Sequence, residues 1–324
     1  MHTQKALKIA ALSCVAIFAI GVLAFGLATG FGIDDLLGRG KTENYDTPYT
    51  YTEELEYLDA LVVEWANGPV EVSVYDGDVV TVTETAKGTL REDEKLEIVI
   101  NGGTLSVHWD SAWMPLKVME GNEKALKVQL PKALVEDLTS LSVQTASGDV
   151  SVQALTAREI KLQTASGSIE AAELSAGQMT LVSVSGTVHG TDLTGTESMS
   201  VSNVSGETVL DGVKADVLTL STTSGKIEAE GRAESISCKS VSGAVALSLQ
   251  QFAEKTEIST VTGSVELRAP ETDKGFTGTI QTVSGDVTCG FAAKQDGDVW
   301  TAGDGEAVLR ISTTSGAVTL EPTA

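Results

Sequence analysis

The most repeated reactive group in this sequence is a hydroxyl side chain directly before a glycine. It occurs in nine copies: Ser147, Ser166, Ser185, Ser205, Ser224, Ser242, Thr262, Ser284 and Ser315. A serine acts as a nucleophile only when a base lies beside it and a third group orients that base. The repeated phrase supplies neither partner. These residues therefore predict a structural role and not hydrolytic chemistry.

One acid–base combination follows from the spacing of the copies. His189 and Glu170 both stand three residues after the glycine of their own copy. If successive copies stack, the two side chains lie on adjacent strands, about 5 Å apart. That distance suits an acid–base pair. The simpler interpretation is a solvated pair on an exposed face, and it is the one favoured here.

Other catalytic and ligand-binding patterns leave no trace in the sequence. Glycoside cleavage uses two carboxylates about 5–9.5 Å apart, but the columns beside the glycines do not stack acids: Asp149 is followed by Ser168, and Glu207 by Lys226. No calcium repeat, zinc spacing or phosphate-binding loop occurs. We therefore predict no catalytic, cofactor-binding or metal-binding residue, and a protein that is not an enzyme.

The copies themselves define a repeat of roughly 19–20 residues. Successive glycines, from Gly148 to Gly316, are separated by 19, 19, 20, 19, 18, 20, 22 and 31 residues. Apolar residues recur five before and two after each glycine and alternate with polar ones, which indicates half-buried strands on both sides of a tight turn. In the fourth copy Val209 is out of step by one residue, which suggests a bulge.

A unit of this size cannot bury its own apolar face, so neighbouring units must stack. The expected fold class is all-β: a single-stranded β-solenoid (β-helix) with regular coils over residues 141–324. Small polar residues three before each glycine, such as Thr145 and Thr164, should hydrogen-bond between coils at the corner. An antiparallel sandwich remains the alternative fold.

The preceding segment carries a weaker form of the same pattern. Apolar residues flank Gly68 and Gly103 at the same offsets as in the regular copies. Residues 58–140 are therefore expected to form looser, irregular coils that are continuous with the solenoid. Within this segment Trp109, Trp113 and Met114 lie next to Pro115. They predict either an exposed aromatic patch for a partner or, as the preferred reading, a cover for the first coils.

The N-terminus predicts a membrane anchor. Residues 9–33 contain no charged side chain and exceed the ~20 apolar residues that span a bilayer. Lys5 and Lys8 precede this stretch, so residues 1–8 are expected in the cytoplasm and the rest of the chain outside. A cleaved signal peptide is the competing interpretation. Cys14 matches a lipoprotein signal only weakly, and the small pair Gly26 and Gly30 could seat a helix dimer.

Residues 34–57 are polar and interrupted by glycine and proline, which predicts an irregular extracytoplasmic tether. Four tyrosines gather there, at positions 45, 49, 51 and 57, and are expected to pack against the first coil. Outside the anchor the cysteines are Cys238 and Cys289. They fall in different core columns two coils apart, which predicts two buried free thiols and no disulfide.

Composition limits the partners. The formal net charge is −23, which excludes nucleic acid because its phosphates require a basic surface. It also disfavours anionic lipids or wall polymers unless a divalent cation bridges them. The expected partners are the lipid bilayer, through residues 9–33, and an envelope protein or a cell-wall polymer. A homo-oligomer is left open.

Residues 126–152, LKVQLPKALVEDLTSLSVQTASGDVSV, resemble the bacterial "putative adhesin" family of unknown function. The stretches NGPVEV and DGDVVTV also resemble its N-terminal portion, so the likeness covers roughly residues 58–324. The resemblance implies a stacked β fold at the cell envelope and supplies no functional residues. The expected function is a non-enzymatic, single-pass, membrane-anchored extracytoplasmic module, adhesin-like or structural. The alternatives are a carbohydrate-active enzyme on the same scaffold and an envelope-stress sensor.

Overall fold

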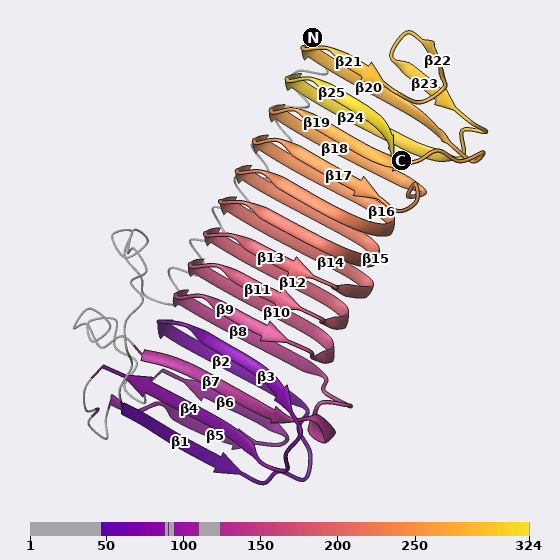
Figure 1. Cartoon of the computed structure of the whole chain (residues 1–324). Coiled ribbons are helices and arrows are strands. Elements are labelled where there is room, and N and C mark those ends of the chain that lie inside the picture. Colours follow the sequence, from indigo (N-terminus) through magenta and orange to yellow (C-terminus); the bar gives the residue numbers. More distant parts are fainter. Residues whose placement is uncertain (1–46, 88–89, 91–93, 110–123, 324) are drawn as a thin grey trace. The chain divides into compact units, whose positions relative to one another are not determined.

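The computed structural model describes residues 47–87, 90, 94–109 and 124–323 (Figure 1). These residues fall into two units, divided between Leu193 and Thr194. The described residues form strands and one short 3-10 helix, which confirms the all-β prediction. None of the helical structure described there is long and apolar enough to cross a bilayer. The predicted cytoplasmic segment 1–8, the predicted anchor 9–33 and residues 34–46 of the predicted tether lie outside the described residues.

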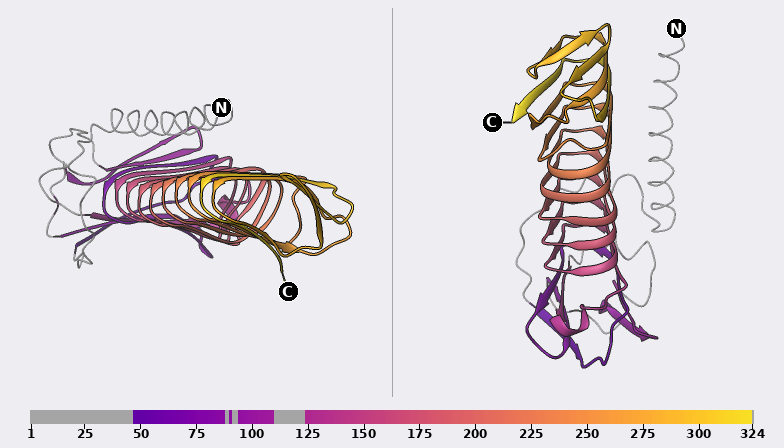
Figure 2. Two further views of the ribbon diagram at one scale, coloured as in Figure 1. Left: turned by 90° about the horizontal axis from the view of Figure 1, so that it is seen from above. Right: turned by 90° about the vertical axis from the view of Figure 1, so that its right-hand side faces the viewer.

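The N-terminal unit consists of strands joined by short turns. Its elements are β1 Thr47–Glu53, β2 Ala60–Asn67, β3 Val70–Tyr75, β4 Val80–Ala86, β5 Glu97–Asn101, β6 Thr104–His108, β7 Lys124–Pro131, η4 Lys132–Leu134, β8 Ser140–Ser147, β9 Val150–Gln153, β10 Thr156–Ser166, β11 Ile169–Ala172, β12 Ser175–Ser185 and β13 Val188–Thr191. From β8 onward each coil is a long strand, a tight corner and a short strand. Successive coils of each unit stack as flattened loops (Figure 2).

The register of these coils is the one predicted from the glycines. Strand β10 pairs in parallel with both β8 and β12, so that Leu162 lies between Val143 and Leu181. All three side chains are fully buried. Alternate residues of these strands therefore form continuous apolar columns inside the coils, which confirms the solenoid-like stacking.

Glycine is required at the corner chiefly because the backbones approach closely there. A Cβ on Gly167 would overlap the carbonyl oxygen of Gly148 in the coil below, and Gly167 also has a φ of +144°. The hydroxyl column three residues earlier serves the same corner: Thr164 Oγ1 donates to the Gly148 carbonyl at 3.0 Å, and Ser183 Oγ to that of Gly167 at 3.2 Å. The hydrogen bonds predicted for this column are confirmed at four positions, Thr164, Ser183, Thr282 and Thr313. The prediction was wrong for Thr145, Thr222 and Thr260, whose buried hydroxyls have no hydrogen-bond partner in the described part of the chain.

We expect Gly167→Ala to lower the free energy of unfolding by about 2–4 kcal/mol, because the methyl group must displace a neighbouring backbone carbonyl as well as strain φ. Ser168→Ala, at the next residue, is the control and should cost less than about 1 kcal/mol. Denaturant melts of both variants provide the measurement. An equal effect of the two changes would contradict the role of close backbone approach.

The order of the first coils differs from the order of the chain. Strands β2 and β3 pair directly with β8 and β9, while the later strands β6 and β7 lie on the other side of β2 and β3. Gly103 is not a solenoid corner: with Gly102 it forms the two-residue turn of the antiparallel β5–β6 hairpin, both with positive φ. The prediction for this glycine was wrong because the offsets of apolar residues are the same in a hairpin.

The predicted tether also needs correction at its C-terminal end. Residues 47–53 form β1, which pairs antiparallel with β4, and β4 pairs antiparallel with β7. The alternating Thr and Tyr residues of TPYTYTE favour a strand. The proline at position 48 hid this preference, because proline usually interrupts a strand. These antiparallel strands cover the edge of the first coil, which would otherwise invite pairing with another chain.

The C-terminal unit contains β14 Thr194–Ser205, β15 Thr208–Ser224, β16 Ile227–Ser242, β17 Val245–Leu249, β18 Lys255–Thr262, β19 Val265–Pro270, β20 Phe276–Ser284, β21 Val287–Cys289, β22 Ala293–Asp296, β23 Val299–Ala302, β24 Ala307–Ser315 and β25 Val318–Thr323. Here too the last coils are out of chain order. Strands β24 and β25 insert between β18–β19 and β20–β21. The β22–β23 hairpin then covers part of β20 by antiparallel pairing.

The irregularity expected at Val209 is displaced by a few residues. Thr208, not Val209, occupies the buried column and pairs with Ile227. The register of β15 against β16 shifts only between Leu210 and Val213. Thr208 stands at the expected core position, but its hydroxyl marked it as polar. The neighbouring apolar residue, Val209, was therefore taken as the core residue.

Candidate functional site

The predicted neighbours Glu170 and His189 are brought together. They are register partners in the parallel pair β11–β13, and both side chains are exposed. No hydrogen bond or ion pair joins them in the described part of the chain. The arrangement agrees with a solvated pair on an exposed face.

The aromatic segment is split between a buried residue and residues outside the described ranges. Trp109 is buried, and its ring packs edge-on against Trp65 with centroids 4.7 Å apart. This position fits the covering role and removes Trp109 from any exposed patch. Trp113, Met114 and Pro115 lie outside the described residues.

Both cysteines of the β domain are free thiols, in agreement with the prediction of no disulfide. Cys238 is fully buried, and burial raises the pKa of its thiol to about 12. Cys289 is only half-buried, which corrects the prediction that both are buried. The reason is its place on β21, a short strand of the outermost coil. Within the described ranges, no three His, Cys, Asp or Glu side chains are grouped so as to hold a metal ion.

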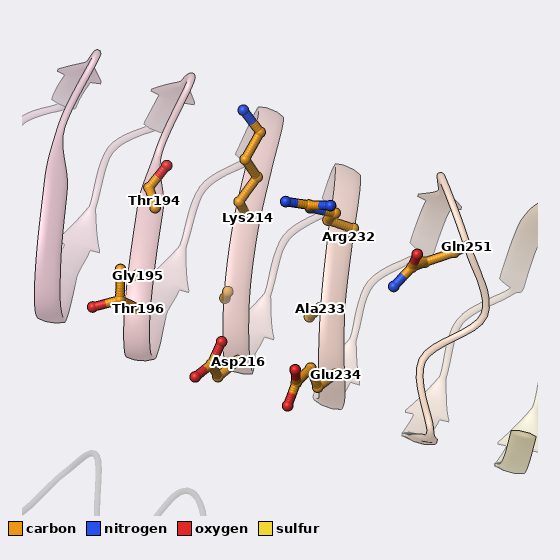
Figure 3. A pocket seen from close by; sticks show the side chains of 10 residues that line it. Thr194, Gly195, Thr196, Lys214, Asp216, Arg232, Ala233, Glu234 and Gln251 are labelled. Carbon is orange, nitrogen blue, oxygen red and sulfur yellow. The ribbon is translucent and has the colours of Figure 1, made fainter.

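The structure reveals a charged hollow that the sequence analysis did not identify. It has a volume of about 330 Å³ and lies over the N-terminal part of β14, the middle of β15 and β16, and the loop after β17 (Figure 3). We call it the charged hollow. Its lining residues are Thr194, Gly195, Thr196, Lys214, Ala215, Asp216, Arg232, Ala233, Glu234 and Gln251.

Three stacked tripeptides build the charged hollow. Thr-Gly-Thr at 194–196, Lys-Ala-Asp at 214–216 and Arg-Ala-Glu at 232–234 follow one another on neighbouring strands. Thr194 pairs with Lys214, and Lys214 with Arg232, so these side chains form one row across three coils. The central residues, Gly195, Ala215 and Ala233, alternate with the two rows along each strand, so they face the interior of the coil and no side chain stands between the rows.

The two outer rows carry opposite charge. Lys214 and Arg232 form a cationic row together with the Gln251 side chain, while Asp216 and Glu234 form a parallel anionic row (Figure 3). The rows are two residues apart along each strand, about 6.6 Å. All four charged side chains are exposed.

The charges of the charged hollow are stacked like over like. Elsewhere the chain places opposite charges on neighbouring strands, as in the pairs Glu71–Lys127 and Arg268–Glu321. In the charged hollow a lysine faces an arginine, although like charges directly opposite each other are destabilising. None of Lys214, Asp216, Arg232 and Glu234 has an ion-pair partner within the described part of the chain.

The columns next to the glycines give no sign of this site, because acids do not stack there. A signal was present. Lys-Ala-Asp and Arg-Ala-Glu repeat the order cation, alanine, acid with the spacing of one coil. The carboxylates of Asp216 and Glu234 are stacked acids at outward positions away from the glycines.

Chemically, the charged hollow can hold a charged group by ion pairing and hydrogen bonding. The cationic row presents ammonium, guanidinium and amide donors, and the anionic row presents carboxylate acceptors. No histidine lines it.

Comparison with solved structures gives proteins of the same fold at low identity. A crystal structure of a "putative adhesin" from Parabacteroides distasonis matches with a TM-score of 0.53 and 13% identity, over 84% of this chain and 97% of that chain. A "putative adhesin" from Bacteroides fragilis matches with a TM-score of 0.45 and 13% identity, over 86% and 97%. Likeness at this level of identity shows the fold alone.

Comparison with curated proteins gave no match. The model of one family, described as Toastrack DUF4097, matches residues 58–321, a range that contains the described strands from β2 to β24 and most of β25. This range also contains the charged hollow. The chain therefore belongs to the Toastrack DUF4097 family.

Proposed function

We propose that this protein is a non-enzymatic, adhesin-like interaction module of the bacterial cell envelope. In this proposal residues 9–33 anchor the chain in the membrane as a single span, and the β domain lies outside. The partner is an envelope protein or a cell-wall polymer. The Parabacteroides distasonis protein of similar fold is described as a "putative adhesin", which supports such a role.

The observation that carries the proposal is the charged hollow itself. Its four charged side chains stand on β15 and β16, which pair with each other through Lys214 and Arg232, and β15 also pairs with β14, so the spacing of the rows is held by the fold. Because the backbone already fixes where these charges stand, a partner that binds has to order only the side chains and not the strands. This is the property expected of a recognition surface.

The orientation of the chain can be tested by brief trypsin treatment of intact cells, stripped of thick wall or outer membrane where necessary. Arg39 and Lys41 lie between the proposed anchor and β1. We expect cleavage there to release a nearly complete acidic β fragment, because paired strands resist proteolysis far longer than irregular segments. Cells expressing Arg39→Gln/Lys41→Gln provide the control and should release much less. Release only after the membrane is breached would place the domain in the cytoplasm and contradict the proposal.

A carbohydrate-active enzyme is the second candidate, favoured by the adjacent carboxylates of Asp216 and Glu234. Glycosidases use two carboxylates on opposite sides of the scissile bond. The full-length protein should then release reducing ends from wall polysaccharide, and Asp216→Asn should abolish that release. We expect no turnover by either protein.

A further inference from the structure

We propose that the charged hollow binds a zwitterion in which a phosphate ester and a primary ammonium group lie a few bonds apart. The phosphate would lie against Lys214 and Arg232, and the ammonium against Asp216 and Glu234. This inference deepens the proposed function by naming the class of ligand. The inference rests on the proposed function only in placing the ligand at the cell envelope.

The cationic row is suited to a phosphate. Guanidinium groups bind phosphate oxygens through two parallel hydrogen bonds, and an adjacent lysine adds a point charge. Thr194 and Gln251 extend the row with a hydroxyl and an amide (Figure 3). A row of four donors across neighbouring coils matches a group with several acceptor oxygens better than it matches a neutral ligand.

The anionic row makes a simple anion an incomplete ligand. Asp216 and Glu234 stand beside the cations and would repel an inorganic phosphate. An ammonium on the same molecule turns this repulsion into attraction. It also relieves the two like-charge contacts at once, because each row then faces a charge of opposite sign. A zwitterion is therefore the ligand class that satisfies all four unpaired side chains.

The four charged side chains of the charged hollow do not lack opposite charges on the neighbouring strand; the order of the residues keeps them apart. If Lys214 and Asp216 exchanged places, each would face an opposite charge on β16, as occurs between Glu71 and Lys127. The sequence order instead keeps cations together and acids together. Binding sites commonly keep such unfavourable contacts because a ligand relieves them.

The first test measures binding of O-phosphoethanolamine to the purified full-length protein by calorimetry or ligand-observed NMR, with inorganic phosphate and ethanolamine as separate probes. We expect O-phosphoethanolamine to bind at least tenfold more tightly than either. Lys214→Gln/Arg232→Gln should weaken its binding at least tenfold. Asp216→Asn/Glu234→Gln should also weaken it, but should leave binding of inorganic phosphate unchanged or tighter.

Two variants serve as controls. Lys226→Gln/Glu228→Gln removes one charge of each sign from an exposed ion pair in the same unit and should not alter binding. Lys214→Asp/Asp216→Lys keeps the composition but creates opposite charges across the coils. We expect this variant to melt at a higher temperature and to lose binding of O-phosphoethanolamine. If the four charges had only a structural role, the melting temperature would change but no binding would be lost.

Two further experiments distinguish the molecules that could carry such a zwitterion, a lipid headgroup and a wall polymer. Vesicles containing phosphatidylethanolamine, compared with phosphatidylglycerol vesicles, test a lipid headgroup. A glycerol-phosphate polymer carrying aminoacyl esters, compared with the unesterified polymer, tests a wall component. Binding to either one, lost in Lys214→Gln/Arg232→Gln, supports the inference. Failure of all these probes, or equal binding of phosphate and O-phosphoethanolamine, would overturn it, while the trypsin test of orientation would stand unaffected.

Discussion

Replacing Ile169 by Asp is expected to unfold the N-terminal unit at room temperature or lower its stability by about 4–5 kcal/mol or more. Ile169 is fully buried between Val150 and Val188 of the adjacent coils, in the middle of an apolar column. A carboxylate there has no partner, and a buried unpaired charge is among the costliest substitutions known. Circular dichroism and thermal melts give the measurement.

The next residue provides a matched control. Glu170 points outward from the same strand, so Glu170→Asp introduces the same side chain one position away on the exposed face. It should change the free energy of unfolding by less than about 0.5 kcal/mol. Comparable melting temperatures for the two variants would show that the columns are assigned to the wrong face.

The columns could be predicted from the sequence because each coil repeats the same alternation around a glycine. Their spatial order could not. The coil that holds Gly316 pairs with those of Gly263 and Gly285, although it follows both in the chain. Every coil presents the same apolar columns to its neighbours, so the pattern alone does not select between them. The spacing of 31 residues before Gly316 marked an insertion, and the structure shows it to be a connection through the β22–β23 hairpin.

A second corner was missed for a related reason. Ala154, Glu173 and Asp192 all lie six residues after a corner glycine and adopt positive φ. Their different side chains hide a shared backbone conformation, which costs about 1–2 kcal/mol for a residue other than glycine. In the C-terminal unit Gly212 stands at the same offset, six residues after Gly206, with a φ of +72°, and Lys214–Asp216 follow it on β15, away from the glycine-centred pattern. Its residues could be recognised only by comparing Lys214–Asp216 with Arg232–Glu234 as stacked units.

The N-terminal unit contains a buried ion pair with no precedent in the repeat pattern. Lys124 Nζ lies 2.8 Å from Glu84 Oε1, and both side chains are almost completely inaccessible to solvent. The ammonium also donates to the carbonyl oxygens of Trp109, at 3.0 Å, and Glu94. Glu84 Oε2 accepts a hydrogen bond from the Leu96 amide at 3.0 Å.

The aromatic rings complete the surroundings of this cation. The Nζ atom lies 4.5 Å from the centroid of the Trp109 ring and 5.8 Å from that of Trp65. Cation–π contacts are strengthened when water is excluded. The pair joins β4 to β7 where the antiparallel strands cover the first coil, so its loss should loosen that cover.

We therefore expect Lys124→Met to destabilise the protein by about 3–5 kcal/mol, because it leaves the Glu84 carboxylate buried without a counter-charge. The double variant Lys124→Met/Glu84→Leu should recover most of that loss, since an apolar pair of similar size restores packing without a charge. Lys127→Met is the control: its pair with Glu71 has the same 2.8 Å separation and lies on the same strand, but is about half exposed. Surface pairs contribute about 0–1 kcal/mol. If denaturant melts gave equal losses for Lys124→Met and Lys127→Met, or if the double variant were no more stable than Lys124→Met, the stabilising role of the buried pair would be refuted.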